Sequence, residues 1–460
     1  MAQGGQLMHE LWQKIQQRGR RLRPAQLIIF AFAALIALGT LLLSLPLSSV
    51  SRESCGGVTA LFTATSALCV TGLTVVQTAA SWSLFGKTVI LCLIQIGGLG
   101  FMTIVSVFYF LLHRRIGLKQ RMLLAQSLSL NGFDGVVRLV RHALIGTVAC
   151  EGAGALILAA RFASEMPLHQ AIWYGVFHSI SAFCNAGFDI LGSSSMQPYV
   201  TDPLVNVTLI ALITSGSLGF FVWEDLRNQR TARIRRLTVH TRIVLFMTVS
   251  LLLLGTALFA ALEWNNPETI GNLSADKKLL ASAFQSVTLR TAGFETVRQG
   301  GLTEAAQALS VVYMFIGGSP GSTAGGAKTV TVAVLLLAVL SSLRGRPRVT
   351  VCGRTIDDGQ VRSALALVAI MVLLIFSGGL FLTVYEDLPF LSCLYEAASA
   401  LCTVGNTTGI TGSLHLPSQL LLIIFMFFGR VGIMTISLGF LLSDRAETRC
   451  QYAETRVLIG

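Results

Sequence analysis

Long apolar stretches alternate with shorter amphipathic ones along the chain, and the same order occurs four times. Each unit predicts a long apolar helix, a short amphipathic pore helix that ends at a glycine, and a second long apolar helix. The long stretches reach the ~20 residues that a helix needs to cross a hydrocarbon core of ~30 Å, whereas the short ones are predicted to be re-entrant. The predicted segments are 25–49, 58–73 and 84–112; 136–160, 169–188 and 203–223; 241–263, 277–294 and 304–343; and 361–385, 391–406 and 417–442.

The four short segments share a sequence pattern. An aromatic residue opens each one, small and hydroxyl-bearing residues follow, and a two-residue step leads to Gly72, Gly187, Gly293 or Gly405. These glycines recur at intervals of roughly 110 residues, which is the length of a structural unit and not of a local motif. A glycine that ends a helix permits a backbone conformation that a β-carbon penalises, and it leaves carbonyl oxygens free to face a ligand. Four such ends around one axis predict a ring of carbonyls, which is how a selectivity filter for a monovalent cation is built.

We therefore predict that carbonyl oxygens next to the glycines replace part of the hydration shell of K⁺. The predicted filter and K⁺ site consists of Val70, Thr71 and Gly72; Asn185, Ala186 and Gly187; Thr291, Ala292 and Gly293; and Thr403, Val404 and Gly405. Glycine in all four turns favours potassium, because a β-carbon on any of them would crowd the ring. The third segment is one residue shorter between its aromatic residue and its glycine, which predicts a shifted register for that pore helix.

A glycine-rich segment, 317–329, interrupts the last apolar stretch of the third unit. Its five glycines and its proline prevent a helix from passing through unbroken. A nucleotide-binding Walker A motif would need a glycine directly before the lysine, where this chain has Ala327, and a preceding strand, where the chain has an apolar helix. We favour a flexible gate that crosses the cavity below the filter. The predicted gate residues are Gly317, Gly318, Ser319, Pro320, Gly321, Ser322, Thr323, Ala324, Gly325, Gly326 and Lys328, together with Arg430.

The composition excludes an ordinary soluble protein. Of the 460 residues, 53% are hydrophobic and 12% are charged, whereas about a quarter of the residues of a soluble domain are charged. Lys and Arg give the net charge of +12, and most of them collect in alternate connections, at 14–23, 114–141, 227–242, 344–362 and 445–456. This positive-inside pattern predicts cytoplasmic termini, and it attributes the basic surplus to topology and membrane lipid, not to nucleic acid.

These observations predict an all-α polytopic membrane protein with four helix–pore loop–helix repeats around a pseudo-fourfold axis and eight spanning helices. The predicted divisions are a cytoplasmic N-terminal segment (1–24), repeat 1 (25–112), repeat 2 (113–226), repeat 3 with the gating segment (227–343), repeat 4 (344–443) and a cytoplasmic C-terminal segment (444–460). Charged residues within the membrane are costly and are functional candidates. We expect Arg430 to line the central cavity or to pair there, Arg290 to brace the third turn from behind, and Glu151 to make a structural hydrogen bond.

These stretches are similar to those of the Trk/Ktr/HKT potassium-transporter superfamily, most of all to the Ktr-type membrane subunit. The most specific similarities are 61–67 with 70–73, 95–103, 284–287 with 290–294, 317–329 and 429–432, and the similarity covers nearly the whole chain. The resemblance implies one K⁺ pore per subunit, a homodimer in the bacterial cell (inner) membrane, and a cytoplasmic ring of RCK-type regulatory subunits that bind the nucleotide. It also implies that the glycines form the filter, that the glycine-rich segment is the gate with Arg430 beside it, and that serine in the first turn accompanies sodium preference.

The chain departs from that pattern at Asn406, where the other turns have Leu73, Phe188 and Phe294, and we expect different packing behind the filter there. The alternatives within transport are a Trk-type or Na⁺-translocating relative and a carrier that couples Na⁺ or H⁺ to K⁺. Carriers usually break helices in matched pairs, whereas the sequence predicts one interruption, in 304–343. A membrane-embedded enzyme would need convergent acid, base or nucleophile residues, and the sequence offers scattered charges. We predict K⁺ as the substrate, Na⁺ as a candidate coupling or activating ion, and no enzymatic activity.

Overall fold

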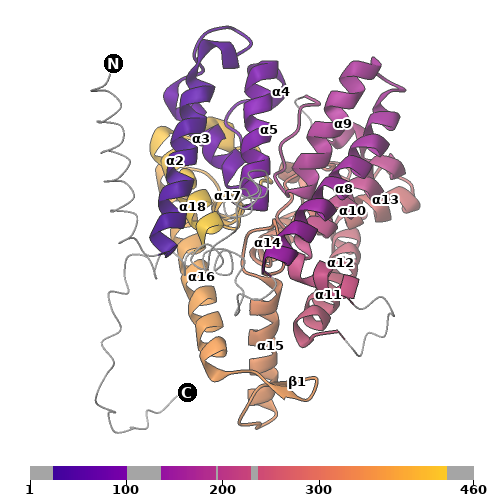
Figure 1. Cartoon of the computed structure of the whole chain (residues 1–460), viewed down its shortest axis with the longest axis vertical. Helices are drawn as coiled ribbons and strands as arrows, with labels where there is room; N and C mark the ends of the chain where they lie inside the picture. Colours follow the sequence, from indigo (N-terminus) through magenta and orange to yellow (C-terminus); the bar gives the residue numbers. More distant parts are fainter. Residues whose placement is uncertain (1–23, 101–135, 193–194, 229–236, 433–460) are drawn as a thin grey trace.

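The computed structural model describes residues 24–100, 136–192, 195–228 and 237–432 (Figure 1). Helices make up nearly all of the regular structure in these ranges. The strands there are β1 (Thr350–Val351) and β2 (Arg354–Thr355), which pair antiparallel in a small hairpin at one end of the molecule. The predicted all-α fold class is therefore confirmed. The predicted N- and C-terminal segments, 1–24 and 444–460, lie almost wholly outside the described residues.

Four helices of the described ranges are long and apolar enough to span a membrane. They are α2 (Pro24–Ser44), α8 (Val136–Phe162), α12 (Val239–Glu263) and α16 (Asp358–Glu386), and each is the first helix of a predicted unit. Their outward faces carry large apolar side chains. Leu156, Phe246 and Val384 are 74%, 71% and 84% exposed, as is expected where a helix faces lipid instead of water.

The second helices of the units are shorter than the predicted spans. They are α5 (Leu84–Leu99), α10 (Pro203–Ser217), α14 (Glu304–Phe315) with α15 (Thr329–Leu343), and α18 (Leu416–Val431). Helix α10 bends by 91° into α11 (Phe220–Asn228), so counting that pair as one span gives up to five spans in the described residues. The remainders of two predicted helices, 101–112 and 433–442, lie outside the described residues.

The prediction of one interrupted helix is wrong, because 203–223 is also broken. The break falls at Gly219, whose φ of 91° ends a right-handed helix. A β-carbon at this position would lie 2.7 Å from the carbonyl oxygen of Pro320, so the close approach of the glycine-rich segment also requires glycine. The stretch is mostly apolar, which is why hydrophobicity alone predicted an unbroken helix.

The four pore helices are α3 (Gly57–Leu68), α9 (Leu168–Phe183), α13 (Ala275–Thr288) and α17 (Phe390–Leu401). Short elements complete the described chain: η1 (Pro46–Ser48), α4 (Thr78–Ser81), η2 (Gln197–Tyr199), η4 (Gln299–Gly301) and η5 (Thr411–Ser413). The aromatic residues of the four pore-helix patterns, Phe62, Phe177, Phe284 and Tyr395, are all fully buried. The core of the molecule therefore surrounds the ends of the pore helices, where the candidate site lies.

Candidate functional site

Three of the four pore helices end in the same pair of backbone hydrogen bonds. At the end of α3, the N–H of Val70 donates to Ala67 O (3.2 Å) and the N–H of Thr71 to Ser66 O (2.8 Å), which is a Schellman motif. The equivalent bonds are Asn185 to Ala182 (3.1 Å) and Ala186 to Ser181 (2.7 Å), and Thr403 to Ala400 (3.2 Å) and Val404 to Ser399 (2.8 Å). Each helix is thereby closed two residues before its glycine.

The residue that closes each helix has a left-handed backbone although it is not glycine. The φ angles are 57° at Val70, 60° at Asn185, 68° at Thr291 and 51° at Thr403. Three of these residues are β-branched, for which this conformation is an outlier that costs about 1–2 kcal/mol. The strain is repeated at four equivalent positions, and such strain concentrates at functional sites.

The four turns 70–72, 185–187, 291–293 and 403–405 form a closed ring. A β-carbon on Gly72 would lie 2.5 Å from Ala186 O, one on Gly187 2.8 Å from Ala292 O, one on Gly293 2.6 Å from Val404 O, and one on Gly405 against Thr71 O. Each turn thus abuts the next, and the fourth returns to the first. The structure therefore brings together the residues of the predicted filter, with a backbone carbonyl at each junction; their role in ion selection stays a prediction.

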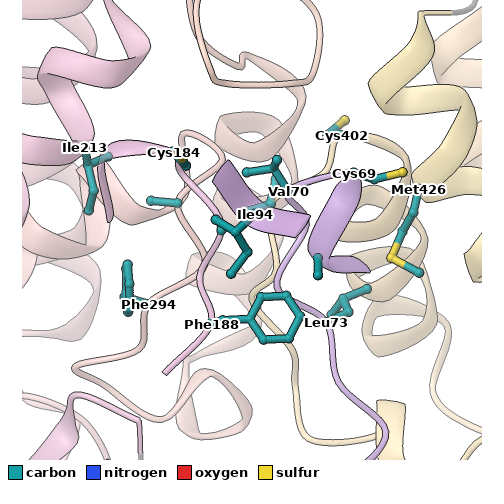
Figure 2. Packing of buried hydrophobic residues seen from close by; sticks show 14 of the residues in the cluster. Cys69, Val70, Leu73, Ile94, Cys184, Phe188, Ile213, Phe294, Cys402 and Met426 are labelled. Carbon is teal, nitrogen blue, oxygen red and sulfur yellow. The ribbon is translucent and has the colours of Figure 1, made fainter. Parts of the chain in front are cut away.

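Figure 2 shows how buried side chains surround this ring. The cysteines that precede three of the turns, Cys69, Cys184 and Cys402, lie toward one side, and the residues that follow the glycines, Leu73, Phe188 and Phe294, lie toward the other. The chain therefore passes the ring in the same direction in the first and second turns, where both residues are drawn. Asn406, at the fourth position of the second set, is fully buried, and neither polar atom of its side chain has a hydrogen-bond partner among the described residues.

The third turn reaches the ring with one residue fewer, as the sequence predicted. Helix α13 ends at Thr288, and Ala292 N donates to Thr288 O four residues back (2.8 Å), instead of five as in the other turns. Arg290 stands where the other turns have cysteine, and it is 3% exposed. Its Nε and Nη2 have no hydrogen-bond partner among the described residues, so these two atoms do not make the bracing contact that we expected.

The glycine-rich segment 317–329 is hydrogen-bonded to the break between α10 and α11. Ser319 N donates to Ser217 O (3.0 Å), Thr323 N to Gly216 O (3.2 Å), and Phe220 N to Gly321 O (3.0 Å). Thr323 Oγ1 also donates to Phe183 O, the last residue of α9 (3.1 Å), and a β-carbon on Gly325 would meet Thr403 Oγ1. The segment therefore lies directly beside the second and fourth turns of the ring.

Arg430 joins this segment to the end of α5. Its guanidinium donates from Nη1 to Thr323 O and from Nη2 to Gly97 O and Gly98 O. Lys328 Nζ donates to Ala324 O within the segment (2.6 Å). Arg430 thus contacts the glycine-rich segment, which agrees with the place expected for it. Backbone carbonyl oxygens, and not a carboxylate, accept these hydrogen bonds from its guanidinium.

Acidic residues follow the second and third turns, and the sequence reasoning missed them. Asp189 and Glu295 each stand two residues after a ring glycine, and this shared spacing could have identified them. Glu295 accepts a hydrogen bond from Thr407 N (3.0 Å). Burial, together with the nearby carboxylates of Glu396 and Asp189, raises the pKa of Glu295 to about 8, and burial raises the pKa of Asp189 to about 6.

Comparison with known proteins assigns the family. The model of the TrkH family, described as cation transport protein, matches residues 7–448. The chain belongs to this family. It is 39% identical over 446 residues to the potassium/sodium uptake protein NtpJ of Enterococcus hirae, which covers 96% of this chain and 98% of that protein. It is 37% identical over 440 residues to the Ktr system potassium uptake protein B of Bacillus subtilis, covering 96% of this chain and 97% of that protein.

A solved structure has the same fold. The crystal structure of the potassium transporter TrkH from Vibrio parahaemolyticus matches 90% of this chain and 84% of that chain with a TM-score of 0.69, at 20% identity. The protein is therefore a helical, multi-pass membrane protein of a cation transporter family and not an enzyme.

Proposed function

We propose that this protein takes up K⁺ across the bacterial cell membrane as the ion-translocating subunit of a Ktr-type system. The names of the relatives, potassium/sodium uptake protein and Ktr system potassium uptake protein, support this substrate. The observation that carries the proposal is the closed ring of four glycine turns, each held against a carbonyl oxygen of the next. A ring of backbone carbonyls is the ligand set that replaces the hydration shell of K⁺ in selective pores. A single glycine per turn leaves room for few ordered ion sites, so we expect looser discrimination than in a long filter.

The test is the substitution Gly72→Ser. Its β-carbon would lie 2.5 Å from Ala186 O, and the φ of 95° disfavours any side chain. We expect the preference for K⁺ over Na⁺ to fall by about tenfold, which corresponds to ~1.4 kcal/mol, in uptake assays of a potassium-uptake-deficient bacterium. Gly56→Ser is the matched control, because Gly56 has a φ of 88° but open space around it. Equal selectivity in both variants would count against the carbonyl ring.

The glycine-rich segment, with Arg430, is proposed as the gate. Its hydrogen bonds to the break of α10 and its closeness to Thr403 support a position under the ring. Deleting Gly321 to Gly326 is expected to raise K⁺ flux, because the deletion removes the part of the glycine-rich segment that we propose to lie across the ion path. A deletion variant that reaches the membrane in normal amount and shows no gain in flux would refute the gate.

Partners and orientation complete the proposal. The name "Ktr system", which two relatives carry, implies a further component. We infer a homodimer that carries a cytoplasmic RCK-type nucleotide-binding subunit, with both termini cytoplasmic and four repeats in each chain. Complementation with and without a co-expressed regulatory subunit tests the partner. Chemical cross-linking of the membrane protein tests the dimer, and a monomer under all conditions would contradict it.

A carrier that couples Na⁺ to K⁺ uptake is the second candidate function. The bend between α10 and α11 provides a second broken helix, which removes one argument against carriers. Strict dependence of K⁺ uptake on Na⁺, with Na⁺ entering in fixed ratio, would favour this candidate over the channel-like pore.

A further inference from the structure

The second turn of the ring has a polar support that its equivalents lack. Cys184, the residue before this turn, donates from Sγ to Gln95 Oε1 (3.6 Å) and lies 3.8 Å from Glu151 Oε1. Cys69 and Cys402 occupy the same position in the first and fourth turns, and in the described chain neither thiol has such a partner. Among the three turns that carry a cysteine at this position, the polar support is therefore specific to the second; the third turn has Arg290 there.

Glu151 is the centre of this support. It lies in the middle of α8, is 8% exposed, and accepts hydrogen bonds from Gln95 Nε2 at both carboxyl oxygens (3.2 Å each). Its backbone carbonyl accepts from Ser179 Oγ of the pore helix α9 (2.6 Å). One residue of a spanning helix thus contacts both the second helix of the first unit and the pore helix that carries the second turn.

The ion pairs of the described residues include none at Glu151. An acidic residue at membrane depth is costly, and a residue kept there without a cation usually has a function. The packing around the thiol is also tight, since a β-carbon on Gly98 would lie 2.5 Å from Cys184 Sγ. Gln95 and Gly98 therefore confine Cys184 from one side, while Glu151 confines it from another.

We propose that Glu151 is a positioning residue for ion selection, acting through Gln95 and Cys184 on the second turn. Cys184 directly precedes Asn185 and Ala186, whose carbonyls belong to the ring, so a shift of Cys184 is passed to them along the backbone. The inference rests on the proposed function of the ring as a K⁺ filter. It assigns to a side chain outside the ring a share of the discrimination between K⁺ and Na⁺.

The first experiment compares Glu151→Ala with Glu151→Gln. Alanine removes the acceptor for Gln95 and Cys184, and buried donors without a partner shift or cost free energy. Glutamine keeps an oxygen acceptor in the same place. We expect the alanine variant to raise the KM for K⁺ relative to the inhibition constant for Na⁺ by about three- to tenfold, and the glutamine variant to restore the ratio. A purely structural role would instead lower the maximal rate for both ions with the amount of folded protein.

The matched control on the same helix is Thr147→Val. Thr147 is fully buried one turn before Glu151, and its hydroxyl has no partner among the described residues. We expect this variant to leave the ratio of the two constants as in the parent protein. If Thr147→Val changed the ratio of the two constants as much as Glu151→Ala does, any disturbance of α8 would be enough to alter selectivity. That result would overturn the proposal.

A second set of variants keeps the proposal testable if Glu151→Ala does not fold. Cys184→Ala removes the thiol that Glu151 is proposed to hold, and Gly98→Ala pushes against it. Both are expected to lower K⁺ preference, whereas Cys402→Ala, which removes a thiol without polar partners, is expected to have a smaller effect. In a double-mutant cycle, Glu151→Ala should add little to Cys184→Ala, since both act through one contact.

The two proposals can fail separately. If Gly72→Ser lowers selectivity and neither Glu151→Ala nor Cys184→Ala does, the ring is the filter and the positioning role of Glu151 is refuted. If Gly72→Ser leaves selectivity unchanged, the filter itself is refuted, whatever Glu151 does.

Discussion

The first and fourth turns of the ring are held differently from the second and third. In the first and fourth, a serine hydroxyl of the pore helix accepts a hydrogen bond from the glycine N–H: Ser66 from Gly72 (3.1 Å) and Ser399 from Gly405 (3.1 Å). In the second and third, the equivalent hydroxyl donates to the carbonyl after the glycine: Ser181 to Phe188 (2.7 Å) and Thr288 to Phe294 (2.6 Å). The same backbone ring is therefore stabilised by two different hydrogen-bond arrangements.

The charges that follow the turns divide in the same way. Asp189 and Glu295 stand two residues after the second and third glycines, whereas Thr74 and Thr407 occupy these positions in the first and fourth turns. One half of the ring is thus followed by carboxyl groups and the other half by hydroxyls. The comparison teaches that the backbone has near fourfold symmetry while the groups that hold it and the charges beside it have at most twofold symmetry.

The largest expected effect comes from removing the serine hydroxyls. Ser399→Ala leaves the buried Gly405 N–H without an acceptor, which costs about 1–3 kcal/mol. Ser181→Ala leaves the carbonyl of Phe188 short of one donor, which is the less costly loss, because a carbonyl more often lacks a partner than an N–H does. Thermal unfolding in detergent should therefore show a larger loss of stability for Ser399→Ala than for Ser181→Ala. Equal or reversed losses would show that the two arrangements are not energetically distinct.

A smaller effect is expected from the acidic half of the ring. The raised pKa values, about 8 for Glu295 and about 6 for Asp189, mean that both groups take up protons at a higher pH than free carboxyls do. Their negative charge is present above these values and is lost as the pH falls through them. K⁺ affinity should therefore decrease by about two- to fivefold between pH 8 and pH 6 at low ionic strength.

The paired substitutions Asp189→Asn and Glu295→Gln should flatten this pH profile. Glu304→Gln is the control, because Glu304 is an exposed carboxylate in the first turn of α14, which begins shortly after the third turn of the ring. A profile that stays steep in the double variant would mean that other groups titrate, and that the carboxyl groups do not act on the entering ion.

The arrangement of the ring could be predicted because a short local pattern, a pore helix that ends at a glycine, occurs four times in the sequence. Gly72, Gly187, Gly293 and Gly405 each follow a pore helix, and they recur at similar intervals, so units of similar length bring them to neighbouring places. The shortening of the third turn was also visible as one missing residue before Gly293. The role of each glycine in ion selection is not visible in the same way, because the sequence gives their spacing and not the ions that pass.

The broken helix and the buried contacts were harder to predict. The break falls at Gly219 in a mostly apolar stretch, and a glycine within a helix costs only about 1 kcal/mol, so the sequence alone did not require a break there. The missed signal was the recurrence of glycine three residues apart at the ends of second helices, at 97 and 100, 216 and 219, and 429 and 432. The contact of Glu151 with Gln95 joins residues 56 positions apart on different helices, and helix packing in space decides it, not a local pattern.

The smallest expected effect compares the left-handed residues of the first and second turns. Val70→Asn copies Asn185, whose side-chain amide nitrogen is placed to donate to Ala182 O (3.0 Å) and Ile213 O (3.3 Å). In the first unit, Ala67 and Ile94 occupy the positions equivalent to Ala182 and Ile213. Asn tolerates a φ of 57° better than a β-branched residue does, so the variant should gain up to about 1 kcal/mol in thermal unfolding. Val75→Asn is the control, since it loses apolar packing without relieving strain. A loss of stability at Val70 as large as that at Val75 would mean that the packing of Val70 outweighs its backbone strain, and that the first turn is held by its side chains more than the second is.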